Sequence, residues 1–141
     1  MKRSASAIWS GNLKQGKGSL STESGALKQI PYAFVNRFEN TPGTNPEELI
    51  GAAHAGCFSM AFSAFLSNEG FTVQKIETKA QVNLEQINGN WTINAIHLSV
   101  SAIVPNISQE KFIEIANTAK AGCPVSRLLN ATITIDTKLE S

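Results

Sequence analysis

The 141-residue chain has almost no excess charge of either sign and few sulfur atoms. Twelve Lys and Arg residues stand against 11 Asp and Glu, which gives a formal net charge of only +1. A chain without a basic surplus lacks the electrostatic field that attracts nucleic acid or anionic lipid headgroups. We therefore expect no nucleic-acid or membrane partner, and we expect a small molecule or a second copy of the chain instead.

No secretory signal is expected from the first residues of the chain either. The first residues, MKRSASAIWSG, do not contain the apolar stretch of about 7–15 residues that such a signal needs. A cytoplasmic location is therefore predicted. In that reducing compartment the two cysteines, Cys57 and Cys123, are expected to be catalytic, redox-cycling or simply buried, and not permanently cross-linked.

One apolar run, Leu49 to Leu66, is long enough to suggest a transmembrane helix. It consists mainly of Ala, Gly and Ser, has His54 in its middle, and lacks flanking basic or aromatic belts. We interpret it as the buried central helix of a soluble protein. A helix that is apolar all round must be covered all round, which one sheet cannot do. Small residues would let the same helix of a second copy approach closely, so an intimate homodimer is predicted; they are Ala52, Gly56, Ser59, Ser63 and Ala64.

Periodicity and turn residues predict a single α+β domain over residues 1–141, with a mainly antiparallel sheet. Asn45 is expected to cap the long helix, with Pro46 in its first turn and Glu48 at the capping-box position. Strands are predicted at Ser4 to Trp9, Ser19 to Glu23, Tyr32 to Phe38, Thr72 to Gln86, Trp91 to Val104 and Thr132 to Leu139, and helices at Pro46 to Asn68, from Ser108 to near Gly122, and from Cys123 and Pro124 through Leu129.

The two thiols are the only strong nucleophiles in the chain, although free cysteines are often inert packing residues. Cys123 precedes Pro124 near a predicted helix start, with Arg127 four residues on, so local rules favour a thiolate there. Cys57 lies about three turns inside its helix and needs a cation supplied by the fold.

Arg37, in the predicted strand segment YAFVNRF, is the natural source of that cation. Glu47 is free to orient Arg37, whereas Glu48 is explained by capping alone. A solvent-facing arginine and a structural ion pair remain the alternatives.

The two histidines raise two further hypotheses, a zinc site and a catalytic base. His54, Cys57, His97 and Cys123 form a two-Cys, two-His set, but they lack the paired spacing of structural zinc sites. His54 is also a candidate base for Cys57, with a hydrogen-bonded interior histidine as the alternative.

The segments TNPEELIGAAHAGCFSMAFS and AKAGCPVSRLLNA, with RFEN before the first, closely resemble the OsmC/Ohr family, on its OsmC side. The resemblance implies an intertwined homodimer in which antiparallel sheets wrap two central helices. It implies thiol-dependent reduction of organic (alkyl or lipid-like) hydroperoxides by a dithiol such as a lipoylated protein, without a bound cofactor. Carried over by motif, Cys57 is the peroxidatic thiol, Cys123 the resolving thiol, Arg37 the activating cation and Glu47 its carboxylate partner.

Helix geometry adds a constraint of its own. Glu47 and Cys57 are ten positions apart, which corresponds to about 15 Å along one unbroken helix. We therefore expect the partner chain to supply one of them, so that active sites form at the dimer interface. Phe34, Phe38, Phe58, Met60 and Phe62 are candidates to line an apolar slot that prefers an alkyl or lipid-like hydroperoxide, with plain core residues as the alternative. The rival hypothesis is a non-catalytic dimeric stress-associated protein whose apolar slot holds a lipid-like molecule.

Overall fold

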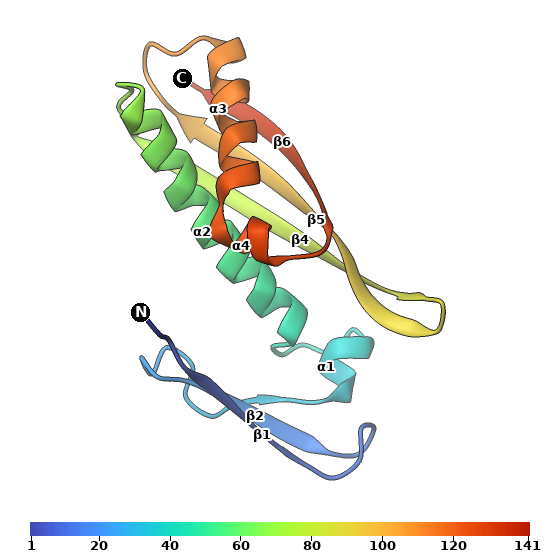
Figure 1. The fold of residues 1–141 in the computed structure, drawn as a ribbon. Coiled ribbons are helices and arrows are strands. Elements are labelled where there is room, and N and C mark those ends of the chain that lie inside the picture. Colours follow the sequence, from blue (N-terminus) through green and yellow to red (C-terminus); the bar gives the residue numbers. More distant parts are fainter. The chain divides into compact units, whose positions relative to one another are not determined.

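The computed structural model describes residues 1–141, and its contacts group the chain into two compact units, Met1–Leu49 and Ile50–Ser141. Figure 1 shows a small sheet with a short helix in the first unit and a longer sheet with helices in the second. The single domain expected over residues 1–141 stays a prediction.

The first unit is built on the antiparallel meander β1 (Ala5–Ser10), β2 (Lys17–Thr22) and β3 (Ile30–Tyr32). Trp9 pairs with Gly18 across the first hairpin, and Tyr32 pairs with Gly18 on its other side. A Cβ atom on Gly18 would lie 2.5 Å from the Tyr32 ring and 2.6 Å from the Trp9 ring. Because glycine has no side chain, the Trp9 and Tyr32 rings can pack against each other over β2, with their centroids 5.4 Å apart.

The predicted strand Tyr32 to Phe38 is wrong beyond Tyr32, because Phe34–Phe38 forms a short helix, α1. The Asn36 side chain accepts a hydrogen bond from the Ala33 N–H at 2.8 Å, which stabilises the first turn. Phe34 and Phe38 are four residues apart, and their ring centroids lie 4.8 Å apart on one helix face. A spacing of four residues between aromatic side chains thus fits a helix as well as a strand. Arg37 therefore lies on helix α1 and not on a strand.

Helix α2 spans Pro46–Asn68, as the sequence predicts. Asn45 Oδ1 accepts the Glu48 N–H at 2.8 Å, and Gly70 follows the helix with φ of 87°. This helix is long and apolar enough to cross a membrane. That alone is weak evidence for a membrane span, because the core helix of a soluble protein passes the same test. Phe58, Phe62 and Leu66 are fully buried in the second unit, so one side of α2 is core.

The second unit contains β4 (Lys75–Ile87) and β5 (Asn90–Ile103), an antiparallel hairpin closed by Asn88 and Gly89. Both turn residues have positive φ, as the favoured two-residue hairpin turn requires. Strand β4 begins three residues later than the predicted Thr72. This hairpin is the longest paired segment of the chain.

Strand β6 (Thr132–Glu140) pairs with β5 in parallel, so the second sheet is mixed. A parallel pair needs a crossover, and α3 (Gln109–Gly122) and α4 (Pro124–Leu128) supply it. Ser108 caps α3 as expected, with its Oγ accepting the Lys111 N–H at 3.1 Å. Three of the four strand pairs are antiparallel, which confirms the α+β class and its mainly antiparallel character.

The core of the second unit lies between this sheet and the helices that cover one of its faces, α2 and α3 (Figure 1). Alternate residues of β5 point into this core. On the helix side, the ring centroid of Phe62 lies 5.5 Å from that of Phe58, also on α2, and 5.3 Å from that of Phe112 on α3. The buried β5 residues are Ile96, Leu98, Val100 and Ala102. Phe58 and Phe62 are therefore core residues and do not line the expected apolar slot.

We predict that Phe112→Ala lowers the free energy of unfolding by about 3–5 kcal/mol, because it removes a fully buried ring and leaves a cavity. The neighbouring change Ile113→Ala is the control, since Ile113 is 40% exposed, and it should cost less than about 1 kcal/mol. Urea unfolding followed by circular dichroism measures both values. Equal losses would contradict this assignment of the core.

Candidate active site

The two cysteines, 66 positions apart in the sequence, meet in the second unit. Cys57 lies in the middle of α2, and Cys123 joins α3 to α4, where Pro124 begins the last helix. The Cys57 thiol is close enough for a side-chain hydrogen bond with Cys123, and both thiols are free. Cys123 is fully buried, whereas Cys57 is partly exposed. A reagent from solvent therefore reaches Cys57 first, which opposes the preference for Cys123 that local sequence rules suggest.

The surroundings of Cys57 favour the neutral thiol. Burial is the largest cause that raises its pKa, and the hydrogen bond with Cys123 raises it further. A hydrogen bond with the Val125 backbone acts in the opposite direction. None of these influences is a cation, so the thiol pair needs a positive charge in addition to obtain a reactive thiolate.

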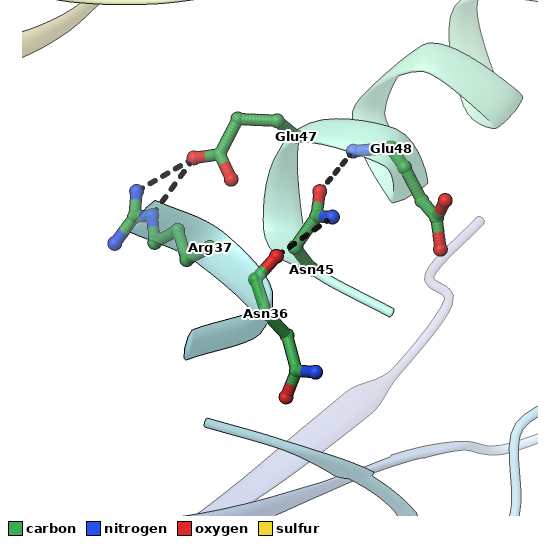
Figure 2. A network of polar contacts seen from close by, with 5 residues as sticks. All are labelled: Asn36, Arg37, Asn45, Glu47 and Glu48. Carbon is green, nitrogen blue, oxygen red and sulfur yellow. Dashed lines mark hydrogen bonds and ion pairs between the residues drawn. The ribbon is translucent and has the colours of Figure 1, made fainter. Parts of the chain in front are cut away.

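The first unit contains a suitable cation, held by one carboxylate. Arg37 of α1 donates from Nε and Nη2 to the same oxygen, Glu47 Oε1, at 2.9 and 2.8 Å (Figure 2). The Glu47 side chain is 11% exposed and that of Arg37 is 36% exposed. The guanidinium is thus fixed on one edge, while Nη1 takes no part in the pair and can face a ligand.

A second contact, which sequence reasoning missed, fixes the helix that carries Arg37. Asn45 caps α2 through its Oδ1, and its Nδ2 also donates to the Asn36 backbone oxygen at 3.2 Å (Figure 2). Asn36 in turn donates to the Pro42 carbonyl at 3.0 Å. The cap was readable from the motif, but the second bond depends on the position of α1, which the sequence pattern assigned to a strand.

An aromatic pocket of about 260 Å³ lies beside Arg37 in the same unit. Phe34 and Phe38 line it, and the Arg37 guanidinium carbon lies 5.3 Å from the centroid of the Phe38 ring. Two of the five residues expected to line an apolar slot are therefore present, while Met60 is exposed on α2. The pocket residues are Trp9, Leu13, Tyr32, Ala33, Phe34, Arg37, Phe38 and Pro46.

The histidines are not brought together with the thiols as a metal site. His54 is fully buried and hydrogen-bonds through Nε2 to Ser126 Oγ at 2.8 Å, and burial lowers the pKa of its imidazole. His97 contacts Thr134 and Asp136 on β6 instead. No group of three or more His, Cys, Asp or Glu residues is placed to hold a metal ion, so the postulated zinc set is not assembled.

Comparison with known proteins gives a consistent family assignment. The family model "OsmC-like protein" matches residues 38–138. Peroxiredoxin OsmC of Escherichia coli K12 is 53% identical over 135 residues, covering 96% of this chain and 94% of that protein. Organic hydroperoxide resistance protein OhrB of Bacillus subtilis 168 is 29% identical over 125 residues, covering 87% and 88%.

Solved structures share the fold at lower identity. The crystal structure of Bacillus subtilis OhrB superposes with a TM-score of 0.69 at 23% identity, covering 97% of this chain and 98% of that one. An OsmC-like protein of unknown function from Vibrio cholerae gives a TM-score of 0.77 at 14% identity, covering 97% and 99%. With the family model matched over most of its length and a relative more than half identical, this chain belongs to the OsmC-like protein family.

Proposed function

We propose that this protein is a thiol-dependent peroxidase that reduces organic hydroperoxides to alcohols, with Cys57 as the attacking thiol and Cys123 as the resolving thiol. The observation that carries the proposal is the contact between a partly exposed and a fully buried thiol within one unit. The names of the relatives, Peroxiredoxin OsmC and organic hydroperoxide resistance protein OhrB, support the same chemistry.

In the first step the Cys57 thiolate attacks the outer peroxide oxygen, and the O–O bond breaks. The leaving alkoxide takes up a proton and departs as the alcohol, while Cys57 becomes a sulfenic acid. A guanidinium suits both ends of this step, because it favours the thiolate before the attack and stabilises the alkoxide during it. Arg37, held by Glu47 with Nη1 free of that pair, is the proposed cation.

In the second step the Cys123 sulfur attacks the sulfenic sulfur, and water leaves as the disulfide forms. This protects Cys57, since a second hydroperoxide molecule would otherwise oxidise the sulfenic acid to the irreversible sulfinic acid. A dithiol, such as a lipoylated protein, then reduces the disulfide by two successive thiol exchanges. We also propose a cytoplasmic location, where such donors are kept reduced.

The aromatic pocket beside Arg37 explains a preference for organic hydroperoxides. Arg37 is its only charged lining residue, and four of the other lining side chains are aromatic. A hydroperoxide whose leaving oxygen lies against the guanidinium would place its organic part against these rings. Hydrogen peroxide has no such part and gains nothing from the pocket.

The active site is proposed to be shared between two chains of a homodimer. Helix α2 is unbroken from Pro46 to Asn68, so Glu47 and Cys57 are separated by about 15 Å of helical rise. Two antiparallel copies of α2 would bring Glu47 of one chain toward Cys57 of the other. An exposed stripe of mainly small residues suits that packing; it consists of Ala53, Gly56, Met60 and Ala64. Ser59, expected in the contact, instead hydrogen-bonds Thr78 of β4.

We predict that Cys57→Ser abolishes turnover of cumene hydroperoxide by a dithiol, because no attacking sulfur remains. Cys123→Ser should consume about two equivalents of hydroperoxide, one to form the Cys57 sulfenic acid and one to oxidise it to the inactive sulfinic acid, and should then stop. Alcohol formation, followed by chromatography, measures both. Full activity in Cys57→Ser would refute the role assignment, and a wild type that binds fatty acids but reduces no hydroperoxide would support the rival, non-catalytic function.

We predict that Arg37→Ala moves the pH at which Cys57 is half-alkylated upward, because the remaining influences raise the thiol pKa. The rate of oxidation by hydroperoxide should fall about 100-fold, as when an oxyanion donor is removed. Peptide mapping after iodoacetamide labelling gives the pH profile, and Arg3→Ala, which removes an exposed charge, is the control. An unchanged profile in Arg37→Ala would contradict the proposed cation.

We predict that inactive Cys57→Ser and the roughly 100-fold slower Arg37→Ala restore activity when their chains are mixed in one dimer. In a shared site, the intact Arg37 of one chain serves the intact Cys57 of the other. Random mixing makes about half of the dimers hybrids, and one of the two active sites in each hybrid has both an intact Cys57 and an intact Arg37. Roughly a quarter of all sites are then complete, so activity per chain should reach roughly a quarter of the wild-type value. Co-refolding an equimolar mixture tests this. Activity no greater than that of the separate variants would show that each site lies within one chain.

A further inference from the structure

Buried His54 and partly buried Ser126 form a pair beside the thiols that takes no part in the proposed chemistry. His54 is on α2, one helical turn before Cys57, and Ser126 is on α4, three residues after Cys123. Nε2 of His54 and Oγ of Ser126 are 2.8 Å apart. Helix α2 and the segment that begins with Cys123 are therefore in contact at two neighbouring turns of α2. One contact is the hydrogen bond between His54 and Ser126, and the other is between the two thiols.

The direction of this hydrogen bond follows from the other ring nitrogen. Nδ1 of His54 is the only buried side-chain nitrogen or oxygen without a hydrogen-bond partner. Burial lowers the pKa of the imidazole, so the ring is neutral and carries one proton. A buried N–H without an acceptor costs more than an unused lone pair. The proton therefore belongs on Nε2, which donates to Ser126 Oγ.

Helix α4 needs such a directional contact. It has only five residues, and Val125 within it and Leu129 directly after it make apolar contacts with the core, which are not directional. Oxidation of Cys57 adds an oxygen atom to one member of the thiol contact, so that contact changes during turnover. The histidine–serine bond does not involve a reacting atom and persists through this step.

We propose that His54 and Ser126 are positioning residues that hold Cys123 within reach of oxidised Cys57 and so set the rate of disulfide formation. The inference rests on the proposed function. The reaction it controls joins the Cys57 sulfenic acid and the Cys123 thiol into a disulfide and releases water. The first oxidation of Cys57 by hydroperoxide does not depend on the pair.

The test compares the two oxidation steps in Ser126→Ala, Ser126→Thr and Ser59→Ala. Ser59 is a matched control because its hydroxyl also bonds from α2, at 2.7 Å, but to Thr78 of β4. Each folded variant, confirmed by circular dichroism, is mixed with cumene hydroperoxide, quenched in acid and analysed by mass spectrometry. The spectra give the rate of Cys57 oxidation, the rate of disulfide formation, and the fraction of Cys57 that has gained two oxygen atoms.

Ser126→Ala should form the disulfide about tenfold more slowly, the factor expected from losing one directional hydrogen bond. It should also accumulate the doubly oxidised Cys57, with an unchanged first step. Ser126→Thr, which keeps the hydroxyl, should restore the rate, and Ser59→Ala should behave as wild type. Disulfide formation in Ser126→Ala as fast as in Ser59→Ala would overturn the inference. If cumene hydroperoxide does not oxidise Cys57 of the wild type, the proposed function fails instead.

Discussion

The contact between Cys57 and Cys123 is the constraint on which the proposed chemistry depends, because a sulfenic acid is useful only if a second thiol captures it. The fold produces this contact through one topological feature. Strand β6 runs parallel to β5, so the chain must cross back over the sheet, and α3 and α4 make that crossing on the face that α2 also covers. The junction of α3 and α4, where Cys123 lies, therefore meets the middle of α2.

The same contact explains why the thiols alone do not make a reactive site. Burial and the neighbouring thiol both raise the pKa of Cys57, and no cation in its surroundings opposes them. The proposed cation, Arg37, is held in the first unit by Glu47, and the helix that carries it is held by the Asn45 bond to Asn36. Thiol and charge thus come from separately built parts, and a dimer that joins them would link reactivity to assembly.

Much of the fold could be predicted from local signals, and the failures have physical causes. Asn45 and Pro46 fixed the start of α2, and Asn88 and Gly89 fixed the hairpin, because caps and turns depend on neighbouring residues. Helix α1 was missed because aromatic residues at positions 34 and 38 suit a strand or a helix turn. Neither the parallel direction of β6 nor the bond between His54 and Ser126, 72 residues apart, leaves a local trace.

The most direct test of the central claim asks whether the two thiols of one chain react with each other. Chains labelled with heavy nitrogen are co-refolded with unlabelled chains, oxidised with one equivalent of cumene hydroperoxide and digested without reduction. Because the contact lies within one unit of one chain, Cys57 and Cys123 peptides should be linked only as light–light or heavy–heavy pairs. Light–heavy pairs, or Cys57 linked to Cys57, would contradict the account.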